Sequence, residues 1–122
     1  MIKAAYLLLT TSLAVGLFAF ASDSVSASEE EMSRLEQGRE LAFTRRKGNC
    51  LACHMIEGGE LMGNYGPPLM MMKARFPDRD VLRAQIWDAA IRNSDTRMPP
   101  FGRNRILTEE EIDLVTDYIQ SL

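Results

Sequence analysis

The order of apolar and polar positions along the chain predicts helices, and no segment keeps the period of two that is typical of strands. The clearest helix begins at Thr108, because Glu111 three residues later completes a capping box. Behind this start, apolar residues recur at helical spacing: Ile112, Leu114, Val115, Tyr118, Ile119 and Leu122. We therefore predict an all-α fold in which this helix contributes one apolar face to the core.

Weaker patterns of the same kind predict two earlier helices. One covers about residues 30–44, and the other covers about residues 80–93, where Leu82 and Ile86 keep a helical spacing. Gly38 lies inside the first of these helices, where a glycine costs about 1 kcal/mol relative to alanine. We interpret Gly38 as a point at which another helix approaches closely.

The beginning of the chain has the pattern of a secretory leader. Residues 4–21 carry no charge, and residues 19–21 (AFA) and 25–27 (VSA) both have the small-x-small form of a cleavage site. A retained membrane anchor is the alternative, because the uncharged stretch is almost long enough to span a bilayer. The polar residues and glycine within it favour cleavage, after Ala21 or Ala27. In a Gram-negative bacterium the product would be periplasmic, with no stable membrane anchor.

Cleavage after residue 21 would leave an acidic chain with room for one small domain. The formal net charge is −3, and the leader contributes only the charge of Lys3, so the processed chain carries −4. This balance does not favour nucleic-acid binding, which uses a basic face. Residues 22–31 are small, polar and acidic, which predicts a flexible leash ahead of a domain at residues 32–122. So small a domain often depends on a disulfide, metal or cofactor.

The residues with the most distinctive chemistry lie in the segment CLACH, residues 50–54. Cys50, Cys53 and His54 are the only cysteines and the only histidine of the chain. A redox-active disulfide would need a strand–helix alternation that this sequence lacks, and a zinc site would need a fourth ligand. Cys-x-x-Cys-His is typical of c-type haem attachment, in which both thiols bind the haem and the histidine ligates its iron. We therefore predict one haem c per chain, because it uses all three side chains.

A methionine is the expected second axial ligand, because no other histidine is present and a thioether is a known partner of histidine on haem iron. Met98 opens the segment MPPFG, in which Pro99 disfavours a helical Met98 and the prolines stiffen the loop. Met55 directly follows the histidine and cannot reach the opposite face of the ring. Met98 is the predicted ligand, and the methionine run at 70–72, with Met72 first, is the alternative.

The segment GPPL, residues 66–69, is a candidate for a supporting role near the iron. A ligating histidine usually donates its other ring N–H to an oxygen, and a carbonyl of this proline-rich loop is a suitable acceptor. The alternative is that the segment is only a turn.

Together these elements resemble the class I cytochromes c. In that family a helix containing a glycine precedes Cys-x-x-Cys-His and crosses a C-terminal helix bearing an aromatic residue, and Gly38 and Tyr118 occupy the matching positions. The family's Gly-Pro-x-Leu segment would place the Pro67 carbonyl on the proximal histidine. Its distal methionine precedes a proline, as Met98 does here. The resemblance implies the class I fold, with helices and long loops around one covalent haem, and His54 and Met98 as axial ligands.

A closer resemblance, over about residues 38–122, is to the SoxX family of monohaem cytochromes. It rests on the segments KGNCLACH, GPPLMMMKARFPDRDVLRAQIWDA, MPPFGRNRILTEEEID and DYIQSL. SoxX is a subunit of the SoxAX complexes of bacterial thiosulfate oxidation, in which the SoxA partner holds the catalytic haem and cysteine. The resemblance implies a heterodimer with a SoxA-type cytochrome. In it, this chain would accept electrons and pass them to a downstream acceptor cytochrome.

Other functions stay open at this point. A free soluble electron carrier would serve another respiratory enzyme. A sensor or peroxidase-like protein would leave one iron position open, and a thiol–disulfide module would contain no haem. Once a haem is attached, no thiol remains for sulfur transfer and no second histidine for acid–base chemistry, so we assign no catalytic residue.

Overall fold

The computed structural model describes residues 22–122, and this part of the chain contains helices and no strand. The elements are α1 (Ser22–Phe43), the 3₁₀ helix η1 (Cys50–Ala52), α2 (Met72–Arg75), α3 (Arg79–Trp87), the 3₁₀ helix η2 (Ala89–Ile91) and α4 (Glu109–Ser121). The all-α prediction is confirmed. The predicted leader, residues 1–21, lies outside the described residues. Within residues 22–122, no helix combines the length and the apolar character needed to cross a bilayer.

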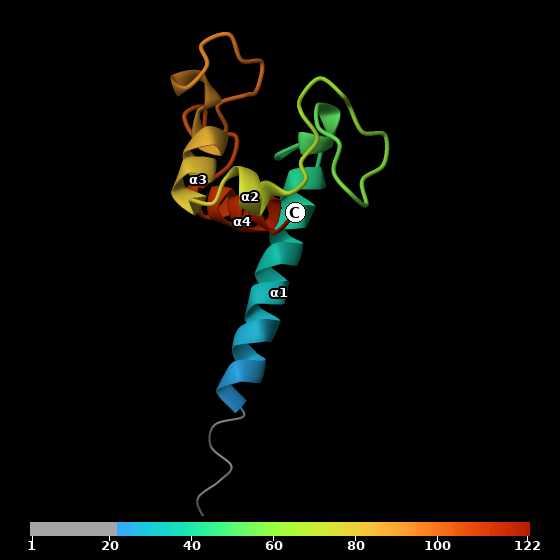
Figure 1. Ribbon diagram of the computed structural model, residues 1–122, viewed down its shortest axis with the longest axis vertical. Helices are drawn as coiled ribbons and strands as arrows, with labels where there is room; N and C mark the ends of the chain where they lie inside the picture. The colour runs from blue at the N-terminus through green and yellow to red at the C-terminus, as the bar shows by residue number, and fades with distance from the viewer. Residues whose placement is uncertain (1–21) are drawn as a thin grey trace, which may run out of the picture.

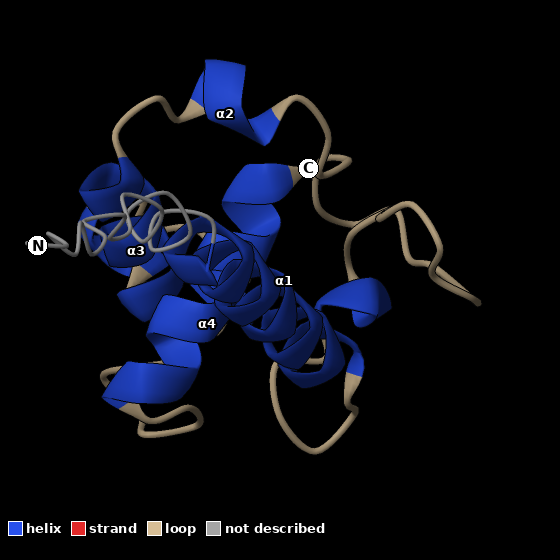
Figure 2. Ribbon diagram, turned by 90° about the horizontal axis from the view of Figure 1, so that it is seen from below, coloured by secondary structure: helices blue, strands red, loops and turns tan. Residues whose placement is uncertain are grey.

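Helices α1 and α4 cross, so the first and the last helix of the described residues are in contact (Figure 2). Gly38 allows the close crossing, since a Cβ atom there would lie 2.1 Å from the backbone oxygen of Leu114 and 2.8 Å from Cβ of Tyr118. Beside this point the rings of Phe43 and Tyr118 meet edge to face, with centroids 6.1 Å apart. The predicted close helix contact at Gly38 is therefore confirmed.

Helix α4 begins where its capping box predicts. The Thr108 hydroxyl accepts the N–H of Glu111, and the Glu111 carboxylate accepts the N–H of Thr108. The predicted apolar face is buried at Ile112, Leu114, Val115, Tyr118 and Ile119. Because this face packs against α1 on one side and α3 on another, α4 is the centre of the core.

Helix α1 begins earlier than predicted. It starts at Ser22 rather than near residue 30, so the segment 22–31, predicted to be a flexible leash, is helical. Figure 1 shows this part of α1, in blue, extending away from the rest of the molecule. Once the second half of α1 is held against α4, adding turns costs little, because each further residue gains a hydrogen bond without a new nucleus. The composition of the segment did not reveal this.

The helix predicted over residues 80–93 is interrupted. Helix α3 ends at Trp87, because Asp88 adopts an extended backbone (φ −156°, ψ 91°). The Asp88 side chain then accepts the N–H of Ala90, which starts η2. The short helix α2 was not predicted. A side-chain cap inside an otherwise helical apolar pattern is not visible from periodicity, which explains the wrong boundary.

Candidate functional site

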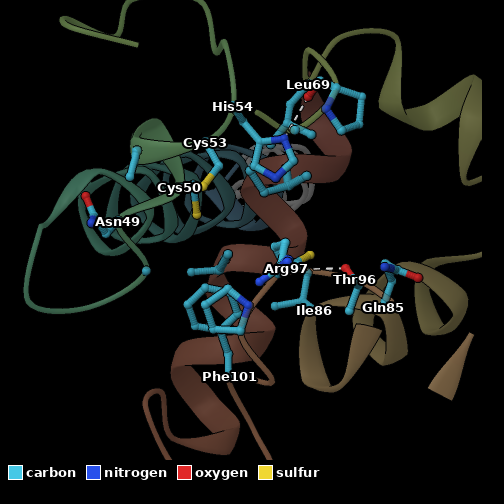
Figure 3. A pocket seen from close by; sticks show the side chains of 18 of the residues that line it. Asn49, Cys50, Cys53, His54, Leu69, Gln85, Ile86, Thr96, Arg97 and Phe101 are labelled. Atoms are coloured by element: carbon cyan, nitrogen blue, oxygen red, sulfur yellow. Dashed lines mark hydrogen bonds between the residues drawn. The ribbon is translucent and has the colours of Figure 1, made fainter. Parts of the chain in front are cut away.

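The CLACH segment follows α1 in a tight turn. Asn49 has a left-handed backbone (φ 47°), and η1 begins at the next residue. The N–H groups of Cys53 and His54 both donate to the carbonyl oxygen of Cys50, at 3.2 and 2.9 Å. This turn brings Cys50, Cys53 and His54 to the wall of the same cavity (Figure 3).

The cavity has a volume of about 840 Å³. Ligand pockets commonly enclose roughly 300–1,000 Å³, so this one is large for a small domain. Its apolar lining comes from the loops and from α3 and α4, and includes Leu69, Phe76, Leu82, Ile86, Phe101 and Val115. Basic side chains also line it, namely Arg45, Lys47, Arg75 and Arg97. The combination suits a large apolar ligand that carries negative groups.

The GPPL loop orients His54. Nδ1 of His54 lies 2.7 Å from the carbonyl oxygen of Pro67, so Nδ1–H donates and Nε2 is left free to bind a metal. Gly66 leaves room for the ring, since a Cβ atom there would lie 2.4 Å from Cε1 of His54. The structure thus shows the contact between Pro67 and His54 that the resemblance to class I cytochromes c implied.

The environment of the Cys50 thiol does not favour a redox disulfide module. Burial raises the pKa of the Cys50 thiol to about 11, and the neighbouring Cys53 adds to the shift. Reactive Cys-x-x-Cys pairs have a lowered thiol pKa instead, so the thiol–disulfide alternative is disfavoured. Within residues 22–122, no group of three or more His, Cys, Asp or Glu side chains is arranged to hold a metal ion.

Met98 and Met72 both line the cavity, whereas Met70 and Met71 are exposed. Met98 is half-buried, and its backbone N–H donates to Oγ1 of Thr96 at 3.2 Å. Figure 3 shows its neighbours Thr96 and Arg97 across the cavity from His54. Met72 is 2% exposed, and its sulfur already accepts from Nη1 of Arg75 at 3.3 Å. The two candidate thioethers therefore differ in their hydrogen bonds. The Met72 sulfur accepts one, whereas the Met98 bond uses the backbone N–H.

A comparison with protein families decides the class of this site. The family model described as cytochrome C oxidase, cbb3-type, subunit III matches residues 33–119, which include every element of the cavity. The chain belongs to this family. It is therefore a c-type cytochrome domain that binds haem covalently and transfers electrons through it. The match identifies a cytochrome domain in this chain and does not assign it an oxidase activity. No curated protein matches the chain.

The residues of the site fit a covalently bound haem. Cys50 and Cys53 line the same apolar cavity as the His54 ring, whose Nδ1 is held by Pro67 so that Nε2 remains for iron. When bound, the haem supplies one-electron redox chemistry, with a potential set by its axial ligands. The chain's own part is to attach the group through the thiols, fix the imidazole and surround the ring with apolar side chains.

Sequence reasoning missed the residues that act on the site through shape. Gly66 was taken only as part of a loop, yet its missing side chain makes space for the His54 ring. Arg75 donates to the carbonyl oxygen of Pro68 at 2.8 Å, which holds the loop next to Pro67. No local pattern marks these roles, because they depend on how the loop folds back over the histidine.

Proposed function

We propose that this chain is the electron-accepting cytochrome subunit of a SoxAX-type complex that oxidises thiosulfate in the periplasm. In this proposal one haem c is attached to Cys50 and Cys53, with His54 and Met98 as axial ligands. Electrons arrive from the SoxA-type partner and leave to a downstream acceptor cytochrome.

The observation that carries this proposal is where the SoxX-like segments lie in the fold. Arg75 and Phe76 of KARFPD line the cavity, as do Met98 and Phe101 of MPPFG. Asp78 of KARFPD caps α3, where its side chain accepts the N–H of the second residue beyond it. Because these segments are more specific than Cys-x-x-Cys-His alone, their position around the cavity supports a SoxX-type subunit over a general electron carrier.

The choice of Met98 as distal ligand is supported by the state of the two thioethers. Met72 is almost fully buried and its sulfur accepts a hydrogen bond from Arg75, so a contact within the protein already holds this thioether. Met98 would keep its backbone bond to Thr96, because that bond uses the N–H and not the sulfur.

The role of this chain within the complex follows from the side chains that remain free once the haem is attached. Attachment uses both thiols, and the His54 ring uses Nδ1 for Pro67 and Nε2 for iron. No thiol or imidazole of the chain is then left to carry sulfur or move a proton. The sulfur chemistry therefore falls to the SoxA-type partner, and this subunit transfers electrons.

The test is reconstitution with a SoxA-type cytochrome. The full chain is produced in a host that attaches haem, and mass spectrometry of the product is expected to show the polypeptide plus one haem. On mixing, size-exclusion chromatography is expected to show a stable heterodimer. Thiosulfate should then reduce the haem of this chain when the sulfur-carrier protein is added, because SoxAX complexes join thiosulfate to a cysteine of that carrier and release two electrons. A haem-loaded monomer that neither binds the partner nor is reduced in its presence would instead identify a free electron carrier.

A further inference from the structure

The segment that carries Met98 has little regular structure of its own. Between the end of α3 at Trp87 and the start of α4 at Glu109, only the short helix η2 interrupts the loop. A metal ligand has to be held to within about 0.5 Å of its working position. Something outside regular secondary structure must therefore fix this loop.

The loop folds back on its own beginning directly after α3. The N–H of Gly102 donates to the carbonyl oxygen of Trp87 at 3.0 Å. The Gly102 backbone also lies against the indole ring, since a Cβ atom there would come within 2.1 Å of Cδ2 of Trp87. The chain thus leaves Trp87, passes through Met98 and returns to the same point at Gly102.

An ion pair lies beside this contact. The carboxylate of Asp88 is the buried partner, with the residue only 3% exposed. One oxygen accepts the N–H of Ala90 at 3.1 Å, and the other pairs with Nη1 of Arg103 at 2.9 Å. A buried carboxylate is costly without a counter-charge, so Arg103 is held over the closure of the loop.

We propose that Asp88 and Arg103 are positioning residues that hold Met98 over the iron, as a clasp at the base of the distal loop. This inference rests on the proposed role of Met98 as axial ligand. From Arg103 the chain reaches Met98 through Gly102, Phe101, Pro100 and Pro99. Gly102 is held by its hydrogen bond to the Trp87 carbonyl. The prolines have fixed φ angles, and Phe101 is 6% exposed in the cavity wall. A stiff link of this kind passes a displacement of the clasp on to the thioether.

The experiment measures how readily an external ligand displaces the thioether. Imidazole is titrated into the ferric haem-loaded protein, and binding is followed by absorption, including the sulfur-to-iron charge-transfer band. Arg103→Gln is expected to bind imidazole at least about tenfold more tightly than the wild type, because the clasp is open. Arg103→Lys, which keeps the charge, should recover part of this difference. Arg92→Gln is the matched control, since Arg92 is an exposed arginine of the same loop and should behave as the wild type.

Asp88→Asn and the double variant Asp88→Asn/Arg103→Gln complete the set. If the two residues act as one clasp, the double variant should bind imidazole no more tightly than the stronger single variant. Asp88→Asn carries the risk of misfolding because the residue is buried, but Arg103 is largely exposed and its variants decide the question.

The outcomes separate this inference from the proposed function. If Arg103→Gln lowers only the melting temperature and leaves imidazole affinity and the charge-transfer band unchanged, the pair is merely structural and the clasp is wrong. If Met98→Leu also leaves the wild-type band unchanged, Met98 is not the ligand, and both the ligand assignment and the clasp fail. Heterodimer formation with a SoxA-type cytochrome is independent of either result.

Discussion

The chemistry of the site depends on the position of one imidazole ring. The Pro67 carbonyl fixes which nitrogen of His54 carries the proton, and Gly66 provides the space in which the ring lies. Cys-x-x-Cys-His identifies the histidine from the sequence, but the space around its ring depends on a contact between two loops. The sequence could therefore propose His54 as a ligand, but it could not predict the shape that orients the ring.

Gly66→Ala tests this contact. A Cβ atom 2.4 Å from Cε1 of His54 must displace either the ring or the GPPL loop. We expect the haem-loaded variant to lose about 1–3 kcal/mol of unfolding free energy, the usual cost of overpacking, together with a changed reduction potential. Denaturant unfolding and a redox titration measure the two effects. Asn64→Ala, at an exposed position of the same loop, is the control and should change neither. A variant with wild-type values for both would show that the ring has free space.

Met98→Leu and Met72→Leu form a pair that assigns the distal ligand. We expect Met98→Leu to lose the six-coordinate low-spin spectrum and to bind carbon monoxide in the ferrous state, because leucine has no donor atom. Met72→Leu should keep the spectrum, because we propose Met98 as the ligand and the Met72 sulfur contacts Arg75. Absorption spectra with and without carbon monoxide provide the measurement. The reverse pattern would move the ligand to Met72.

At the scale of elements, ion pairs tie three helices together. Arg79 of α3 donates to Asp117 and Asp113 of α4, and Arg34 of α1 donates to Asp117. Arg83, one turn further along α3, pairs with Asp113 and Glu109. The pairs lie where α3 approaches α4. They therefore help to hold α3, whose C-terminal end leads into the loop that carries Met98. These ion pairs join residues that lie far apart in the sequence, so no local pattern predicted them.

Asp117→Asn should weaken this connection in a pH-dependent way. Burial acts to raise the pKa of Asp117, but hydrogen bonds from Arg79 and Arg34 outweigh it and hold the pKa below its usual value. A carboxylate with a lowered folded-state pKa contributes stability above its unfolded pKa of about 3.9, and this is lost as pH falls through the folded-state pKa.

We therefore expect Asp117→Asn to lose about 1 kcal/mol of unfolding free energy near neutral pH, since the pairs are only partly buried. The difference from the wild type should shrink as pH falls below about 4, where the aspartate of the unfolded chain becomes protonated, and it should vanish below the lower folded-state pKa. Denaturant unfolding followed by circular dichroism over this range gives the values. Glu60→Gln changes an exposed acid outside these ion pairs and should stay level with the wild type. A constant difference at all pH values would contradict the ionic explanation.

How well each helix could be predicted depended on whether its signals were local. The capping box placed the start of α4 at the right residue, because Thr108 and Glu111 need only each other. The end of α3 was not predicted, because it depends on the extended backbone of Asp88, whose side chain contacts Arg103 and Ala90. The true start of α1 was missed because support from α4 is a tertiary effect.

At the scale of the whole molecule, the core is arranged around the cavity. The buried side chains of α3 and α4 that face inwards include Leu82, Ile86, Val115 and Ile119, and each of these also lines the cavity. Leaving even a quarter of the 840 Å³ dry would cost about 5 kcal/mol, which is comparable to the whole stability of a small domain. The haem is therefore expected to be a structural part of the fold as well as its redox group.

The double variant Cys50→Ala/Cys53→Ala, which cannot attach haem, should accordingly lose its fixed packing. We expect much of the helical far-ultraviolet circular dichroism to remain, because α1 and α4 still meet at Gly38. The near-ultraviolet signal of Trp87 should weaken, since its packing on Gly102 belongs to the loop that closes over the cavity. The wild-type chain made without haem attachment is the control, and it should behave like the variant. If either haem-free protein unfolded cooperatively at the midpoint of the haem-loaded protein, the helices and their ion pairs alone would account for the stability, and the haem would only occupy a cavity that the polypeptide already holds open.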